Sequence, residues 1–377
     1  MGLNKHRLGE FIELRESVNS DLKYGLDYVR GVNNLKQLMP TKADLNGRDL
    51  SKFQIVYPGD FVFNHRTSRN GSKFSIAYND GEAPVICTED YVVFRVKADA
   101  KTVLLDGWLY MFFNRDEFDR YVITNSWGSS TEFYNWEDIC DVKIDLPSLP
   151  IQQKYVAIYK AMVANQQSYE RGLENLKLTC DGYVEDLRRN TKAERIGLYI
   201  SEIDARNTLG LTVDRVVGIS TAKELIETKA NLDGVSIDSY KVVQPGQITY
   251  VPDTSRRGDK MALAINGTEN PVLVSSIYTV FQTNNAHLLP DYLMLFLTRS
   301  EFDRYARFCS WGSARETFSW EEMCNVQIPV PDIVIQKAIA EVFSVYNKRK
   351  KINEQLKAQI KGICPILIRG SLEEGKA

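Results

Sequence analysis

The sequence predicts an α+β protein built from two related domains, each followed by a long helix. Three observations support this fold class. The segment 108–163 recurs 184 residues later, β-branched and aromatic runs fill the first part of each copy, and a heptad pattern of apolar residues follows each copy. We therefore expect two tandem units whose long helices pair as an antiparallel coiled coil with pseudo-two-fold symmetry.

The repeat is carried by identical motifs in the same order. The motif EFDRY at 117–121 returns at 301–305, and SWGS at 126–129 returns at 310–313. Upstream of residue 108 the offset becomes 187, as expected if the halves differ by a short insertion. A period of about 185 residues is too long for a solenoid, so these are duplicated domains.

The repeat and the change to a helical pattern set the expected domain boundaries. A length of 377 residues and a hydrophobic content of 44% agree with two globular domains. The expected parts are a first domain at 1–148, its helix at 149–192, a second domain at 193–332, its helix at 333–370 and a tail at 371–377.

Strands are expected early in each domain and a helix later. The strand candidates are rich in Val, Ile, Tyr and Phe and are bounded by Pro-Gly turns. The expected strands are 53–57, 61–63 and 91–96 in the first copy and 240–243 and 277–281 in the second, and the expected helices are 108–121 and 292–305.

The long helices are predicted from their apolar seams. From Tyr155 to Leu187 apolar positions alternate steps of four and three, and such a helix is about 50 Å long. The seam from Ile339 to Leu367 is less regular, and Pro365 should end or kink that helix near Cys364. The alternative is two separate amphipathic helices, each packed on its own domain.

Composition indicates the cellular location of the protein and the charge that it offers to a ligand. No window approaches eighteen apolar residues and the start is polar, so we expect a cytoplasmic protein with no membrane contact. Cys140 and Cys324 occupy equivalent places and suggest small buried thiols. With a net charge of −2, basic groups for a nucleic acid must be local, or other subunits must share the electrostatic work.

A duplicated fold suits a partner with two related sites, of which double-stranded DNA is the commonest. The best candidate for base and phosphate contact is a Gly- and Asn-containing basic loop, because guanidinium groups suit guanine and phosphate and an amide suits adenine. Its residues are Arg66, Thr67, Ser68, Arg69, Asn70 and Lys73 in the first copy and Thr254, Ser255, Arg256, Arg257 and Lys260 in the second.

Differences between the copies of this loop suggest separate roles. Arg69/Arg256 and Lys73/Lys260 recur, which fits shared phosphate contacts. Asn70 and Arg257 stand at one position and differ, which fits the reading of different bases. The alternative is a solvated basic loop between strands.

A second candidate is the loop after a tryptophan in each copy. Its donors are Ser129, Ser130 and Thr131 in the first copy and Ser313 and Arg315 in the second. The alternative is a Gly-Ser turn that only connects helix to strand. We expect the EFDRY motif to be structural, because residues that discriminate bases should differ between the copies. Four tryptophans are expected to anchor the cores, with stacking platforms for a ligand as the alternative: Trp127, Trp136, Trp311 and Trp320.

At this point the chain resembles the specificity subunit of type I restriction-modification systems, often called HsdS. The resemblance covers the full length and depends on the doubled order of recognition domain and spacer helix. It also depends on the turn at 58–63, the helix at 108–121 and the Gly128-Ser129 loop before Trp136. The run 144–153, echoed at 328–337, looks like the family's entry into its spacer helices.

This resemblance implies a non-catalytic DNA-reading subunit. Each target-recognition domain would read one half of a bipartite target, and the helices would space the domains and dock two DNA adenine methyltransferase subunits. Endonuclease/translocase subunits would join for restriction. S-adenosylmethionine, ATP and Mg are then expected in the partner subunits, and no cofactor in this chain.

Motifs of catalysis are missing from the sequence. The nearest approach to an adenine methyltransferase loop is 270–273, which has one proline and no aromatic residue, and no Gly-rich cofactor loop or Walker lysine occurs. His6, His65 and His287 are far apart, so we expect no metal or catalytic residue in this chain. The alternative function is a pseudo-symmetric protein-interaction scaffold without DNA binding, which near-neutral charge would suit.

Overall fold

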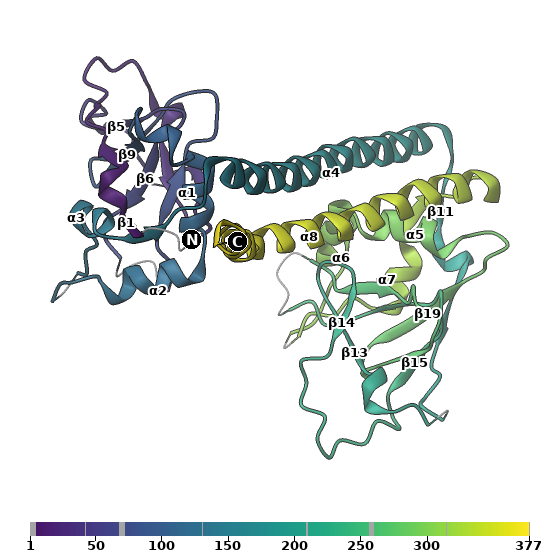
Figure 1. Cartoon of the computed structure of the whole chain (residues 1–377). Coiled ribbons are helices and arrows are strands. Elements are labelled where there is room, and N and C mark those ends of the chain that lie inside the picture. Colours follow the sequence, from purple (N-terminus) through teal and green to yellow (C-terminus); the bar gives the residue numbers. More distant parts are fainter. Residues whose placement is uncertain are drawn as a thin grey trace. The chain divides into compact units, whose positions relative to one another are not determined.

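The computed structural model describes residues 5–41, 43–67, 72–129, 131–208, 210–255, 260–313 and 315–376. The chain forms two compact units, one of residues 1–168 with 353–377 and one of residues 169–352. The two divisions fall at equivalent places in the repeat, 184 residues apart. Each unit therefore combines one α+β domain with one part of each long helix (Figure 1).

The two domains have the same order of elements. The first contains β1 (Lys5–Arg7), η1 (Leu8–Glu10), β2 (Ile12–Leu14), η2 (Leu26–Tyr28), β3 (Arg30–Val32), β4 (Leu38–Pro40), β5 (Gln54–Val56), β6 (Phe61–Asn64), β7 (Ile76–Tyr78), β8 (Val85–Cys87), β9 (Tyr91–Val96), η3 (Ala100–Thr102), α1 (Asp106–Phe113), α2 (Asp116–Thr124), α3 (Trp136–Cys140) and β10 (Lys143–Asp145). The second contains β11 (Ala193–Arg195), η4 (Ile196–Leu198), β12 (Ile200–Ile203), η5 (Val213–Arg215), β13 (Val217–Ile219), β14 (Leu225–Glu227), β15 (Lys241–Val243), β16 (Ile248–Tyr250), β17 (Leu263–Ile265), β18 (Val272–Val274), β19 (Thr279–Thr283), α5 (Pro290–Leu297), α6 (Ser300–Phe308), α7 (Trp320–Asn325) and β20 (Gln327–Pro329).

An antiparallel four-stranded sheet lies at the centre of each domain. Its order is β2-β9-β6-β7 in the first domain and β12-β19-β16-β17 in the second. In the first sheet Val62 pairs with both Ala77 and Val93, and in the second Thr249 pairs with Ala264 and Val280. The ladders β1-β10 and β11-β20 join the beginning and end of each domain. These strands confirm the β character expected for the first part of each copy.

The single helix expected at 108–121 is wrong, because the chain forms two helices there, α1 and α2. Arg115 lies between them in extended conformation (φ −100°, ψ 143°), and its Nε donates to the Phe112 carbonyl at 2.9 Å. The break allows Phe113 and Phe118 to enter the same core, although they lie five residues apart and would diverge on one straight helix. The second copy repeats the break at Arg299, between α5 and α6.

Each core is completed by the far end of a long helix. In the first domain Trp108 is fully buried and its Nε1 donates to Ser371 Oγ at 3.0 Å, near the end of α8 (Ile333–Lys376). Cys364 and Ile368 of α8 are buried in the same core. The second core takes Val184 from the end of α4 (Leu149–Asn190). In Figure 1, α5, α6 and α7 lie between the first part of α8 and the strands of that unit.

The long helices also pack on each other, which confirms the coiled-coil prediction. In unit 1, Lys154 near the start of α4 pairs with Glu374 near the end of α8 at 2.8 Å, so the helices are antiparallel. Gln166 Nε2 donates to Asn353 Oδ1 at 3.0 Å, and both side chains are buried in the seam. A buried polar pair of this kind favours one register of the two helices.

Helix α8 continues through Pro365 to Lys376. The prediction that this helix could end near Cys364 is therefore wrong. Proline in a helix interior costs about 3 kcal/mol. The helix continues because Cys364, Leu367 and Ile368 on both sides of the proline are buried in the first core. The residues expected as a tail, 371–376, are therefore helical. The division into recognition domains at 148 and 332 stays a prediction.

The equivalent cysteines pack against equivalent glycines. Cys140 and Cys324 are half-buried rather than fully buried, and burial raises the pKa of the Cys140 thiol to about 11. A Cβ on Gly9 would lie 2.9 Å from Cys140 Cβ, and one on Gly197 would lie 2.8 Å from Cys324 Cβ. The close approach explains why both copies keep a glycine at this place.

Candidate nucleic-acid interface

The two candidate loops lie together in each domain. Thr67 N donates to the Glu132 carbonyl at 3.0 Å, and its Oγ1 donates to the same oxygen at 3.2 Å. In the second domain Thr254 makes the same two bonds to the Glu316 carbonyl, at 3.0 and 3.1 Å. Both threonines are buried, so they position the loops and do not present their side chains to a ligand. In each domain the start of the basic loop thus lies beside the tryptophan loop.

The other end of each basic loop is held by a buried ion pair. Asp119 Oδ1 accepts from Phe74 N at 3.1 Å and contacts Lys36 Nζ at 2.6 Å. The second domain repeats this with Asp303, which accepts from Met261 N at 2.9 Å and contacts the Lys223 ammonium at 2.5 Å.

Burial lowers the pKa of Lys36 and of Lys223, while the facing aspartate opposes that shift. Asp119 and Asp303 belong to the EFDRY motif. Their burial agrees with a structural role for that motif.

The recurring lysines of the basic loop differ in their surroundings. Lys73 contacts Asp116 at 2.5 Å and Asp119 at 3.2 Å, and the hydrogen bond to Asp116 raises the pKa of Lys73. Ser300 stands where the first domain has Asp116, and Lys260 is exposed. The second domain therefore offers a positive charge that the first domain neutralises internally.

The starts of the two basic loops also differ. Arg66 forms an ion pair with Asp90 at 3.1 Å, next to the start of β9. The second copy has Asp253 at this place, and its Oδ1 accepts from Ser255 N at 3.0 Å and from Ser255 Oγ at 2.6 Å. This Asx-type turn shapes the chain entering the second loop.

Each tryptophan loop is closed by two reciprocal backbone hydrogen bonds and contains a glycine with a positive φ angle. Trp127 N donates to the Phe133 carbonyl at 3.1 Å and Phe133 N donates back at 3.0 Å. Gly128 has φ +152°, and a Cβ there would overlap the Thr131 carbonyl oxygen. Gly312 repeats this conformation, with φ +146°. Only glycine fits these two positions without moving the loop.

The donors of the tryptophan loop are partly accessible. Ser129, Ser313 and Arg315 are exposed, and Thr131 is half-buried. Six predicted site residues lie outside the described residues: Ser68, Arg69, Asn70, Ser130, Arg256 and Arg257. Their assignment stays a prediction.

Two of the four tryptophans contradict the prediction that they anchor the cores. Trp127 is 72% exposed and Trp311 is 68% exposed. Trp136 and Trp320 do pack against the cores, with ring centroids 5.7 Å from Phe94 and 5.6 Å from Phe281 respectively. The first tryptophan of each pair follows the end of a helix and enters the tight loop, which turns its side chain to solvent.

Sequence reasoning also missed a basic helix face in the second domain. Arg304 and Arg307 are exposed on α6, and Phe308 at its end is 78% exposed. The first domain has Ile123 and Thr124 where the second has Arg307 and Phe308. This difference follows immediately after EFDRY, the most similar motif of the repeat, and it could have predicted the basic face from the sequence.

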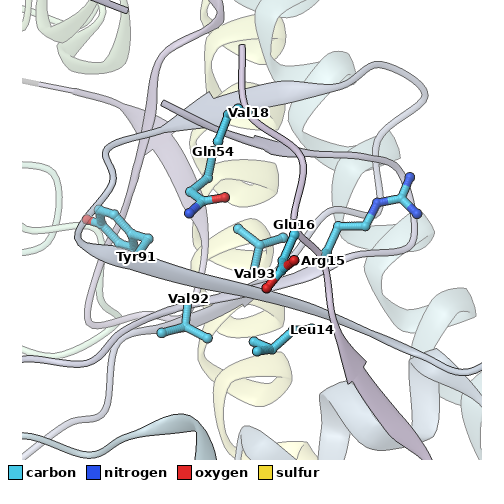
Figure 2. A pocket seen from close by; sticks show the side chains of 8 residues that line it. All are labelled: Leu14, Arg15, Glu16, Val18, Gln54, Tyr91, Val92 and Val93. Atoms are coloured by element: carbon cyan, nitrogen blue, oxygen red, sulfur yellow. The ribbon is translucent and has the colours of Figure 1, made fainter. Parts of the chain in front are cut away.

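A groove along β2 and the start of β9 is distinct from these loops in character (Figure 2). Leu14, Val18 and Val92 line it together with Glu16, while Arg15 is engaged by Asp60 at 3.7 Å. Aliphatic walls and a carboxylate do not suit a phosphate backbone.

In the second domain the equivalent positions carry an ion-pair cluster instead. Asp204 contacts Arg206 at 2.7 Å and Lys241 at 3.2 Å. The side chains that line this groove are therefore not repeated at the equivalent positions of the second domain.

Within the described ranges, no group of three or more His, Cys, Asp or Glu side chains is placed to hold a metal ion. Likewise, none of the described helices combines the length and apolar character that a membrane span requires.

Two related α+β domains, carried by paired long helices, define a protein with a duplicated domain-and-helix architecture. Residues 248–362, from β16 into α8, match the family model for the type I restriction modification DNA specificity domain. The first half of the chain repeats this segment in sequence and in fold, so both halves are similar to the type I restriction-modification specificity domain.

Solved structures agree at the level of the fold. The chain resembles the S subunit of a type I restriction-modification system from M. genitalium, with 10% identity and a TM-score of 0.63, covering 100% of this chain and 96% of that chain. No curated protein sequence matches this chain.

Two further structures have lower scores. One, described as showing complex assembly and conformational transition of the type I R-M system, has 13% identity and a TM-score of 0.45, covering 98% of each chain. The HsdS subunit from Thermoanaerobacter tengcongensis has 14% identity and a TM-score of 0.36, covering 100% of this chain and 96% of that chain.

Proposed function

We propose that this chain is a DNA specificity subunit that reads a bipartite duplex target, with one recognition domain on each half-site. The observation that carries this proposal is that both domains build the same loop pair and fill it with different side chains. Thr131 is replaced by Arg315, and the internally paired Lys73 is replaced by the exposed Lys260. A shared scaffold with different donors suits the reading of different bases.

The long helices would set the distance between the half-sites and dock the other subunits. We assign to this role two DNA adenine methyltransferase subunits and, for restriction, endonuclease/translocase subunits. Exposed apolar side chains such as Leu178 on α4 and Val334 and Ile366 on α8 support a protein partner along the helices. In this proposal the chain itself is non-catalytic, and S-adenosylmethionine, ATP and Mg are bound by the partners in the cytoplasm.

The near-neutral net charge is compatible with this role, because basic side chains gather locally in the second domain. Arg304, Arg307, Arg315 and Lys260 all lie on or beside its loops and are exposed. The partner subunits would supply further positive charge. The scaffold without DNA binding gains no support from the family match.

The deciding experiment is single-molecule sequencing of adenine methylation in cells that express this chain with its methyltransferase, compared with cells that lack this chain. We expect a split motif that disappears without the chain, and the motif gives both half-sites and their gap. An unchanged methylome, with the methyltransferase shown to be expressed and bound to this chain, would favour the interaction scaffold.

A further inference from the structure

We propose that Trp127 and Trp311 are DNA-contact residues, each packing its indole ring against the half-site of its own domain. This inference rests on the proposed function. It adds two DNA-contact residues to the hydrogen-bond donors that the sequence predicts. The first observation is exposure. Both rings are more than two-thirds exposed, whereas Trp108 is fully buried and Trp136 and Trp320 pack on the cores.

Exposure of this kind does not stabilise the fold. A large apolar ring held in water forgoes the stabilisation that its burial would provide. Single exposed apolar residues are common, but here the same exposure occurs at equivalent positions of both domains. Trp is also the residue type most enriched among the side chains that dominate binding energy at interfaces.

The second observation is that the backbone holds each ring in a fixed place. Trp311 N donates to the Thr317 carbonyl at 3.2 Å, and Thr317 N donates back at 3.0 Å. The adjacent Gly312 adopts a conformation that only glycine takes without strain. Ser310 Oγ donates to the Ala306 carbonyl at 2.6 Å, which ties the loop to the end of α6. A preorganised backbone lowers the entropy cost of binding through this residue.

The third observation is the neighbourhood, which selects a nucleic acid as the occupant. Arg66 and Trp127 both form β-bridges with Phe133. The backbone of Trp127 is therefore connected through Phe133 to the start of the basic loop. In the second domain Asp253 and Trp311 both bridge to Thr317 in the same way. Arg315, four residues after Trp311, is exposed and favours a polyanion, whereas Arg307 is paired with Glu316. An aromatic ring beside a cationic group suits the sugars and the apolar base edges of a duplex between its phosphates.

The test uses the full chain assembled with its methyltransferase and fluorescently labelled duplexes that carry the methylated motif. We expect Trp127→Ala and Trp311→Ala each to weaken binding about tenfold or more, because truncation of an aromatic anchor at an interface has an effect of this size. Leu22→Ala and Leu198→Ala are matched controls, because these side chains are 58% and 72% exposed outside the loops and should leave binding unchanged. Trp311→Phe should retain part of the affinity.

Two further readouts separate this role from others. Two duplexes are compared, each with one half-site altered. Trp127→Ala should no longer weaken binding to the duplex whose first-domain half-site is altered, and Trp311→Ala should no longer weaken binding to the other. The fold loss for Trp311→Ala should also stay constant as salt rises, since an apolar contact releases no counterions.

The outcomes distinguish the two levels of the proposal. If the wild-type complex binds its motif and both Trp variants bind equally well, the assignment of these residues is wrong while the proposed function stands. Loss of methyltransferase from the complex, seen by size-exclusion chromatography without DNA, would instead identify a protein contact and overturn it. A wild-type complex that does not distinguish its motif from other DNA would overturn the proposed function as well.

Discussion

At the scale of single residues, the buried Lys223–Asp303 pair connects the scaffold to the basic loop. Asp303 holds both the Lys223 ammonium and the backbone N–H of Met261, the first residue after Lys260. The side chains are about nine-tenths buried, so removing one charge leaves the other without compensation. The pair thus fixes where the loop leaves the domain.

We predict that Asp303→Asn destabilises the second domain by about 3 kcal/mol, because Lys223 keeps its charge while its counter-charge is lost. The amide oxygen can still accept from Met261 N, so the loss reports the ion pair itself. Urea unfolding at neutral pH measures it. Asp291→Asn, at an exposed aspartate of α5, is the matched control and should change stability little.

The same substitution predicts a pH dependence. Burial lowers the pKa of Lys223 below its usual 10.5 and Asp303 opposes this, so the variant's folded-state pKa lies lower still. Above that pKa the folded state binds fewer protons than the unfolded state, and the free energy of unfolding rises with pH. The difference between wild type and variant should therefore shrink as pH rises from neutral toward about 10. A difference that is constant or grows would contradict this assignment.

At the scale of elements, the second domain carries more positive charge at its loops than the first. Lys73 is paired with Asp116 in the first domain, while the second domain has an exposed Lys260 and has Ser300 at the position of Asp116. Arg315 and Arg307 also replace Thr131 and Ile123. Arg307 forms an ion pair with Glu316, so Lys260 and Arg315 are the exposed charges most accessible to phosphate.

We predict that Arg315→Ala and Lys260→Ala each reduce the slope of log affinity against log salt by about 0.9, the amount expected for one phosphate contact. Titration of the assembled complex with labelled target duplex at several salt concentrations gives this slope. Lys229→Ala, an exposed lysine of the same domain outside the two loops, should leave it unchanged. Equal slopes for all three variants would show that these charges do not contact the backbone.

Many of the helices and strands could be predicted because the sequence contains two copies of the same unit. The strands, the long helices and the two loops each occur at equivalent positions, so each prediction had an independent second instance. The break between α1 and α2 was missed because a one-residue extended link at Arg115 carries no proline or glycine signal. The continuation of α8 through Pro365 was missed because burial of Leu367 and Ile368 is a tertiary effect.

The candidate site was less predictable than the fold. The pairing of Lys73 with Asp116 joins residues 43 positions apart, so the sequence could not show that this lysine is engaged. Trp127 was expected in a core because its type favours burial, yet the tight loop at Gly128 decides its direction. Which donors face a ligand depends on such contacts rather than on composition.

At the scale of the whole molecule, each domain depends on the far end of the other copy's helix. The first core is closed by Cys364, Ile368 and Ser371 of α8. The equivalent positions of α4 are Cys180, Val184 and Leu187, which close the second core. Because these surfaces are alike, either domain should fold against either helix end after a small repair.

This equivalence predicts the outcome of domain duplication. Replacing residues 193–332 by a second copy of residues 5–148 places a second Trp108 against α4, and Leu187→Ser restores the hydroxyl that Ser371 offers its indole N–H. If each domain reads its own half-site, the resulting complex should methylate a motif whose two halves carry the same bases. Single-molecule sequencing reads the motif directly, and the original chain with Leu187→Ser alone should keep the original target. A motif that retains both original halves would show that the bases are not read domain by domain, since the second domain would then be absent while its half-site persisted.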